Sequence, residues 1–307
     1  MTTPTFRGPT LLIAEHTDPA ARSSAGIRTL HELHATQLAI AAMARTAPAI
    51  QELPLATAGG RVLARDTVVD TQCDGREGSH VLPAGTRLEW YLLPLLAASS
   101  HGVVAVRAPL RAVVVTLQIE GNREATVGAV MVRSALERMG VQTHGLRIAE
   151  PALPESAALQ RLSKSCDLIL VVDSRVKTPL EGLDAPQHFE VLGRPCMVLP
   201  SCPLAALSSF VAFTVPLLRR LQGRMPELPA IRTATDAAQG DEARVGTGLC
   251  CVSVVPFGDG LRSCMPGPDT SLLLSLAGIA GVAWKPEDLA ATQPSTVAFL
   301  PLAEWLR

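Results

Sequence analysis

Ala112-Val113-Val114-Val115 is an unbroken apolar run, mostly β-branched, and it decides the fold. Such a run is typical of a strand that is buried on both faces of a parallel sheet. Residues Val127–Met139 follow with apolar positions at helical spacing, and Gly140 comes directly after them. Glycine just past the last turn is a common helix end. The sequence therefore predicts a strand followed by a helix that packs back onto it.

The same alternation continues toward the C-terminus. Apolar runs predict further strands, and stretches of helical spacing lie between them. Strands that alternate with helices imply right-handed βαβ crossovers and an α/β fold class. Pro216 is expected to bend the longest helix. The predicted strands are Gln142–Ile148, Leu168–Val172 and Pro195–Leu199, and the predicted helices are Glu155–Leu162 and Pro203–Leu221.

The ends of the chain have a different pattern. Residues 1–26 lack periodicity and are expected to form a flexible arm, and 27–80 form an N-terminal module that begins with a helix from about Leu30 to Met43. A helix at Leu88–Ser99 and a strand at Val103–Val106 open the α/β domain, 81–224. Residues 225–307 are predicted to be a linker, Met225–Glu242, and a small β domain with strands at Gly248–Val255, Leu272–Leu276 and Thr296–Leu300.

Composition excludes several classes of partner. The 307 residues carry a formal charge of −1, so no general attraction to nucleic acid or to anionic lipid is expected. Apolar stretches such as Leu92–Ala98 and Leu272–Ala277 are shorter than the roughly 20 residues that span a bilayer. The first 25 residues lack the pattern of a signal peptide, and the seven cysteines lack CxxC pairs. We expect a soluble, cytoplasmic protein with reduced thiols.

Several segments, taken in order, resemble the MoeA and gephyrin E-domain family of molybdopterin molybdenumtransferases. Leu53–Asp66 contains the Gly-Arg-Val-Leu-Ala turn of that family, and Pro109–Thr116 resembles its first central strand. The other matching segments are Val81–Leu88, Gly193–Pro195, Leu199–Pro203, Pro216–Gly223 and Thr270–Ala277. The resemblance extends over about Leu30 to Leu302.

The resemblance implies a fold and a chemistry. The fold is a central three-layer domain with a parallel or mixed sheet, the molybdopterin-binding fold, with a helical and extended N-terminal module and a small C-terminal β domain. The family inserts molybdenum: it takes adenylylated molybdopterin, binds molybdate with Mg²⁺ assistance and forms homodimers through its first module. A phosphorylated pterin needs backbone N–H groups at helix N-termini and glycines that permit close approach, and the metal needs carboxylates.

The chain departs from the family pattern at the places that bind the ligand. A domain that the family carries between Val69 and Val81 is replaced by a loop containing Asp74, and Asp70 lies nearby. The family's Thr-Gly-Asp-Glu-Leu becomes Thr116–Glu120, and its glycine-rich second loop becomes Val172–Val176. A side chain in a left-handed turn costs about 1–2 kcal/mol. These departures predict weakened or lost catalysis.

The resemblance nevertheless selects candidate site residues. As catalytic carboxylates it implies Glu120, Glu150 and Asp184, for which the alternative is a solvated charge at a strand end. Cys202 begins a helix, and its alternative is simple packing. The metal ligands are unknown, because His31 and His34 share a helix without a third ligand. The candidate cofactor-binding residues are Thr116, Asp173, Ser174, Lys177, Arg194, Ser201, Cys202 and Ser271, with Arg175 as a further cation.

Three hypotheses about function remain open. The chain is a divergent enzyme that still inserts molybdenum, a non-catalytic molybdopterin carrier, chaperone or regulator, or an assembly subunit that pairs with another cofactor-biosynthesis protein. Molybdate-dependent cofactor formation would select the first, and binding of the pterin without turnover the second. Co-purification with a family member and no ligand affinity would select the third. The sequence contains no GxGxxG, GxxxxGK[ST], HExxH or GxSxG motif, which gives dinucleotide, P-loop, zincin and serine-hydrolase functions no support.

Overall fold

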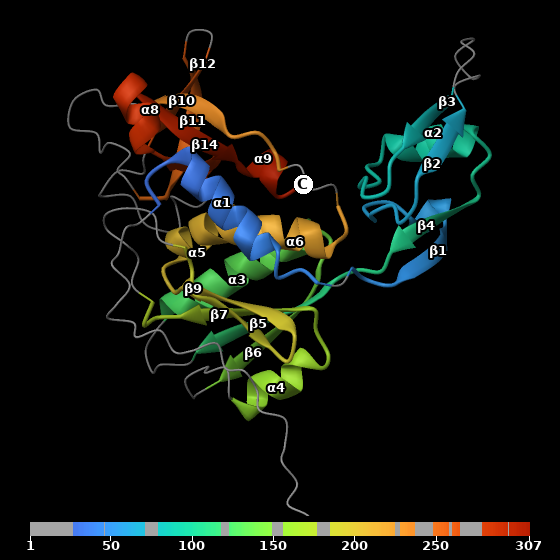
Figure 1. The fold of residues 1–307 in the computed structure, drawn as a ribbon, viewed down its shortest axis with the longest axis horizontal. Helices are drawn as coiled ribbons and strands as arrows, with labels where there is room; N and C mark the ends of the chain where they lie inside the picture. Colours follow the sequence, from blue (N-terminus) through green and yellow to red (C-terminus); the bar gives the residue numbers. More distant parts are fainter. Residues whose placement is uncertain are drawn as a thin grey trace, which may run out of the picture.

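The computed structural model of the protein contains a central α/β domain, a β barrel and a separate N-terminal β module (Figure 1). The residues that it describes are 27–45, 47–70, 79–117, 123–148, 156–176, 185–224, 228–236, 248–257, 260–264, 278–293 and 295–307. The mixed α/β class predicted from the alternating runs is confirmed.

The central sheet has five strands in the order β6-β5-β7-β9-β8. Four of them run parallel and coincide with the apolar runs of the sequence: β5 (Arg111–Leu117), β6 (Gln142–Ile148), β7 (Leu168–Asp173) and β9 (Arg194–Pro200). The edge strand β8 (His188–Val191) is antiparallel to β9 and was not predicted. Leu192 and Gly193 join these two strands with φ values of 49° and 75°, the signature of a tight two-residue hairpin turn.

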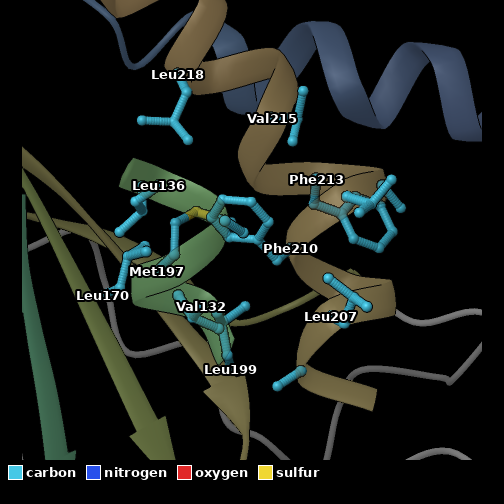
Figure 2. Packing of buried hydrophobic residues seen from close by; sticks show 14 of the residues in the cluster. Val132, Leu136, Leu170, Met197, Leu199, Leu207, Phe210, Phe213, Val215 and Leu218 are labelled. Carbon is cyan, nitrogen blue, oxygen red and sulfur yellow. The ribbon is translucent and has the colours of Figure 1, made fainter. Parts of the chain in front are cut away.

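Helices cover both faces of this sheet, and the side chains of β5 alternate between them. Ala112 and Val114 face a core that includes Leu136, Met197 and Phe210, whereas Val113 and Val115 belong to the cluster on the other face. Figure 2 shows side chains from the sheet and the helices converging in the first core. That face is covered by α3 (Arg123–Arg138) and α5 (Pro203–Ser209), and the other by α4 (Ala157–Ser163). Helix α6 (Val215–Leu221) follows α5 in the same core, and α1 (Leu30–Ala41) packs on α6.

A π-helical turn, η3 (Phe210–Thr214), joins α5 to α6, so that Pro203–Leu221 forms one long helix. Pro216 explains the turn, because it has no N–H to donate to the carbonyl of Ala212, four residues earlier. The buried side chain of Gln37 in α1 supplies the missing donor: its Nε2 lies 2.8 Å from the Ala212 oxygen. This contact ties α1 to the central domain. By length and composition the helix could cross a membrane, but 78% of its apolar window is buried inside the protein.

We expect Gln37→Ala to lower the free energy of unfolding by about 1–3 kcal/mol, because the Ala212 carbonyl would lose its partner in a buried place. Urea denaturation measures the loss. In a Pro216→Ala background the main chain regains an N–H for that carbonyl, so the same Gln37 substitution should cost less there. Equal costs in the two backgrounds would contradict this account of the π turn.

The N-terminal module is built from two small antiparallel pairs. β1 (Ile50–Pro54) pairs with β4 (Val103–Arg107), and β2 (Thr67–Asp70) pairs with β3 (Ser79–Leu82). The 3-10 turn η1 (Leu55–Thr57) and α2 (Leu92–Ala98) complete it, and its core spans Ala58 to Val106. The boundary predicted between this module and the α/β domain lies between residues 80 and 81. The buried side chains, however, group 79–107 with the N-terminal module. They group α1 with the central core.

The C-terminal strands form a closed barrel in the order β10-β12-β11-β13-β14. β10 lies within the stretch that was predicted to be a linker, so that prediction was wrong for residues 232–236. The barrel packs on the central domain, where α5 contacts β11, and α8 bonds to the start of α1. The elements are β10 (Arg232–Asp236), β11 (Cys250–Phe257), β12 (Gly260–Cys264), β13 (Gly281–Trp284), α8 (Glu287–Thr292), β14 (Thr296–Pro301) and α9 (Leu302–Trp305).

Candidate functional site

Three neighbouring strands, β5, β7 and β9, end side by side at the carboxyl edge of the central sheet. Thr116 in β5 lies beside Val172 in β7, and Asp173 at the end of β7 lies beside Pro200 at the end of β9. Ser201 and Cys202 follow directly and begin α5. In open parallel sheets, ligands bind outside the carboxyl ends of the strands. This edge is therefore the candidate ligand site, and it brings together Thr116, Asp173, Ser174, Ser201 and Cys202.

A close contact between α3 and the β9–α5 turn shapes this edge. A Cβ atom added to Gly128 would lie 2.8 Å from the Ser201 carbonyl oxygen and 3.6 Å from Val172 Cγ1. A side chain would therefore push the turn away from the helix. Gly128 was not among the predicted site residues. A glycine inside a helix costs about 1 kcal/mol relative to alanine, so its presence in the predicted helix was a signal that something packs against it.

Asp173 is paired with Arg175 at the end of β7. Arg175 Nε donates to both carboxylate oxygens at 3.1 Å, and Nη2 donates to Oδ2 at 2.7 Å. The backbone N–H of Arg175 donates to Oδ1 at 2.8 Å. Asp173 is buried while the Arg175 side chain is half exposed. The hydrogen bonds to Asp173 raise the pKa of Arg175. The guanidinium group of Arg175 therefore covers the buried carboxylate of Asp173 on its solvent side.

Hydroxyl and thiol groups supply the remaining polar atoms. Ser174 Oγ is buried and has no hydrogen-bond partner among the residues that the structure describes. Cys202 occupies the position before the first turn of α5, where its carbonyl accepts from the backbone N–H of Ala206 and its thiol makes no capping bond. Ser201 is buried and Cys202 is partly exposed. A buried hydroxyl without a partner beside a helix N-terminus is a place where an oxygen of a ligand gains a hydrogen bond.

Arg194 does not join these residues. It begins β9, six residues before Pro200, and at about 3.3 Å per residue it lies about 20 Å from the carboxyl edge. There it lies 3.7 Å from Asp167, which precedes β7 and also accepts from the backbone N–H of Arg111. This cluster belongs to the amino edge of the sheet. Its role in the structure is to join the starts of three neighbouring strands.

The other predicted site residues lie outside the described part of the chain. In the described ranges, no three His, Cys, Asp or Glu side chains form a group that could hold a metal ion. The residues outside are Glu120, Glu150, Asp184, Lys177 and Ser271, together with Asp74.

Three cysteine thiols in the described part of the chain are buried, and burial disfavours the thiolate, which is the reactive form of a cysteine. Burial raises the pKa of Cys166 to about 11 and that of Cys196 to about 12, and burial likewise raises the pKa of Cys251 to about 11. These cysteines act as small core residues, as expected from the apolar runs around them. Cys202 differs because it is partly exposed at the candidate site.

Comparison with solved structures identifies the fold. The chain is similar to a molybdenum cofactor biosynthesis protein from Pyrococcus furiosus, with a TM-score of 0.62 and 19% identity over 83% of this chain and 93% of that one. It is also similar to a molybdopterin biosynthesis MoeA protein from Pyrococcus horikoshii OT3, with a TM-score of 0.57 and 12% identity over 87% and 99%. No family sequence model and no curated protein sequence matches the chain. This protein therefore has the fold of the MoeA molybdopterin biosynthesis proteins.

Proposed function

We propose that this protein acts in molybdenum cofactor biosynthesis and binds molybdopterin, or its adenylylated form, at the carboxyl edge of the central sheet. The observation that carries the proposal is that β5, β7 and β9 end side by side at that edge. The fold is shared over most of the chain with proteins whose names state this function. Thr116, Ser174, Ser201 and Cys202 are the proposed polar contacts. Molybdate is the proposed second ligand.

Catalysis is proposed to be weak or absent. The turn after β9 has side chains at Ser201 and Cys202, and Gly128 already brings α3 against the Ser201 carbonyl. A ligand phosphate can then reach fewer backbone N–H groups than at a glycine turn. The fit to Mg²⁺ rests on Glu120, Glu150 and Asp184, the proposed catalytic carboxylates, which lie outside the described ranges.

Isothermal titration with molybdopterin, with and without molybdate, tests the proposal. Binding with molybdate-dependent product formation indicates an enzyme, and binding without turnover indicates a carrier, chaperone or regulatory subunit. Alkylation of Cys202 locates the site: bound molybdopterin should slow labelling of this partly exposed thiol at least several-fold. If titration with molybdopterin gives no heat and the rate of Cys202 alkylation does not change, the proposal is wrong.

We expect Arg175→Gln to weaken binding of the anionic ligand by about tenfold, because the carboxylate of Asp173 would lose its cation and repel the ligand. The substitution should also cost about 1–2 kcal/mol of stability, a buried-pair value that we reduce because the guanidinium is half exposed. Titration and urea denaturation measure the two effects. The double variant Asp173→Asn, Arg175→Gln should recover the affinity, and a double variant as weak as the single one would contradict the charge argument.

A homodimer through the N-terminal module is also proposed. Val68 in β2 and Val81 in β3 are cross-strand neighbours, and both side chains are more than half exposed. Apolar side chains that gather on an exposed sheet face are typical of an interaction surface. Light scattering at high micromolar concentration tests this, and a monomer would refute it.

A further inference from the structure

An arginine cluster lies at the end of the molecule opposite the candidate ligand site. Helix α3 and the long helix Pro203–Leu221 both begin near the carboxyl edge of the sheet and run back across it, so their C-terminal ends lie at the other edge. Gln222 joins these two ends, because its Nε2 donates to the carbonyl of Met139 at 2.8 Å. The ends face the N-terminal module (Figure 1). The cluster consists of Arg87, Arg138, Arg219, Arg224 and Arg307, with Glu89.

Hydrogen bonds hold these side chains at one place, although they come from distant parts of the chain. Arg87 of the N-terminal module donates from Nη2 to the Arg138 carbonyl at 3.2 Å. Arg224 donates from Nη1 to a main-chain oxygen of Arg307. The Arg307 side chain in turn binds Glu89 at 3.1 Å and the hydroxyl of Tyr91 at 3.0 Å. Four separate segments therefore meet here.

The charges of the cluster do not balance among the described residues. Even with Arg219 left out of the count, four guanidinium groups gather there, and Glu89 is the carboxylate among the described residues that acts on them; the four belong to Arg87, Arg138, Arg224 and Arg307. Burial, together with the positive charges of Arg219 and Arg87, lowers the pKa of Arg224 to about 9. Burial also lowers the pKa of Arg87. The main-chain oxygen of Arg307, which accepts from Arg224, is the other negative group in the cluster. Even if it carried a full negative charge, the guanidinium groups would still outnumber the negative charges.

A simpler account covers only part of this cluster. Arginines in the last turn of a helix interact favourably with its dipole, and Arg138 and Arg219 are so placed. Each helix end supplies about half an elementary negative charge, which is less than the excess. Arg87 comes from another module, and its Nε is buried without a hydrogen-bond partner in the described structure. A buried donor atom without a partner is costly, and a hydrogen bond to an oxyanion would remove that cost.

We propose that the cluster around Arg87 and Arg224 is a binding site for a doubly charged oxyanion, such as the phosphate group of a small ligand. Guanidinium groups bind phosphate oxygens in pairs, and a dianion offsets more of the excess charge than a carboxylate does. Arg87 and Arg224 are only partly buried and Arg307 is half exposed, so an anion can reach the cluster from solvent. The site is separate from the carboxyl edge and does not depend on the proposed function.

Titration with inorganic phosphate at constant ionic strength tests this site. Phosphate should raise the thermal unfolding temperature of the full chain more than chloride or acetate does. Trp90 is largely exposed beside Tyr91, whereas Trp284 and Trp305 are buried, so Trp90 fluorescence gives a second, local signal. Arg87→Gln and Arg224→Gln should each weaken phosphate binding at least tenfold. Arg65→Gln, an exposed arginine of the same module, serves as the matched control and should bind normally.

Several outcomes would overturn the proposal. Phosphate that stabilises no more than chloride removes the site, and acetate that is equally effective removes the preference for a dianion. Equal binding by wild type, Arg87→Gln and Arg224→Gln would place the phosphate elsewhere. If a glutamine variant fails to fold, Arg87→Lys keeps the charge but loses the paired donors, and it should still bind phosphate more weakly than wild type.

Discussion

Gly281→Ala should lower the free energy of unfolding by about 2–3 kcal/mol, toward the upper end of the range for overpacking. An added Cβ would overlap Phe299 Cε2 and would lie 2.6 Å from the carbonyl oxygen of Leu300. Both atoms belong to β14, the strand paired with β13, so neither can move without disturbing the barrel. The smaller flexibility of alanine in the unfolded chain returns only about 0.4–1 kcal/mol. Urea denaturation measures the difference.

Gly278→Ala is the matched control for this barrel prediction. It lies three residues earlier, and an added Cβ there would meet no heavy atom within 4 Å. Its stability should therefore be equal to that of the wild type or slightly higher. Similar losses in the two variants would show that general backbone effects, and not the contact with Phe299, set the cost at Gly281.

Gly128→Ala should weaken binding at the carboxyl edge by about tenfold and lower stability by about 1–2 kcal/mol. Alanine is favoured over glycine by about 1 kcal/mol inside a helix, which alone predicts stabilisation. The Cβ at 2.8 Å from the Ser201 carbonyl oxygen opposes this, because overpacking against backbone costs about 1–3 kcal/mol or more. The turn that carries Ser201 and Cys202 must shift, so the ligand should lose more than the fold does. Titration and urea denaturation separate the two effects.

Gly145→Ala provides the control for Gly128. Its added Cβ would lie 3.2 Å from Arg133 Nη1, the far end of a flexible side chain that can move away. We expect binding to stay within about twofold of the wild type, since β6 lies at the edge of the sheet and the affected atom is not backbone. A variant of Gly128 that is stabilised and binds normally would refute the close contact between α3 and the β9–α5 turn.

Much of the central fold follows from local sequence patterns. Buried parallel strands leave apolar runs such as Val113–Val115, and the helices between them leave periodic ones, so the four parallel strands were predicted nearly residue by residue. The sequence did not predict the edge strand β8, because an edge strand is partly exposed and does not need a continuous apolar run. Strand β10 was missed because Arg232–Asp236 is polar and becomes a strand only by pairing with β14 and β12.

One part of the candidate site likewise followed from the sequence, and another part depended on the tertiary structure. The order of the motifs along the chain sufficed to place Thr116, Asp173, Ser201 and Cys202 at or just beyond the ends of three parallel strands. Those strands, β5, β7 and β9, are neighbours in the sheet, so their ends lie at one edge. The covering of Asp173 by Arg175 depends on side-chain orientation in the loop. The position of Arg194 at the opposite edge depends on which end of β9 it occupies, and motif resemblance alone does not register that.

By itself, the sequence determined the alternation of strands and helices, because burial on both faces of a sheet leaves its mark in neighbouring residues. Only the tertiary structure decided what distant residues do together. The support of the Ala212 carbonyl by Gln37, the contact of Gly128 with Ser201 and the meeting of Arg87 with Arg224 join residues more than 70 positions apart. Such contacts depend on how elements pack in space, and no local pattern encodes that packing.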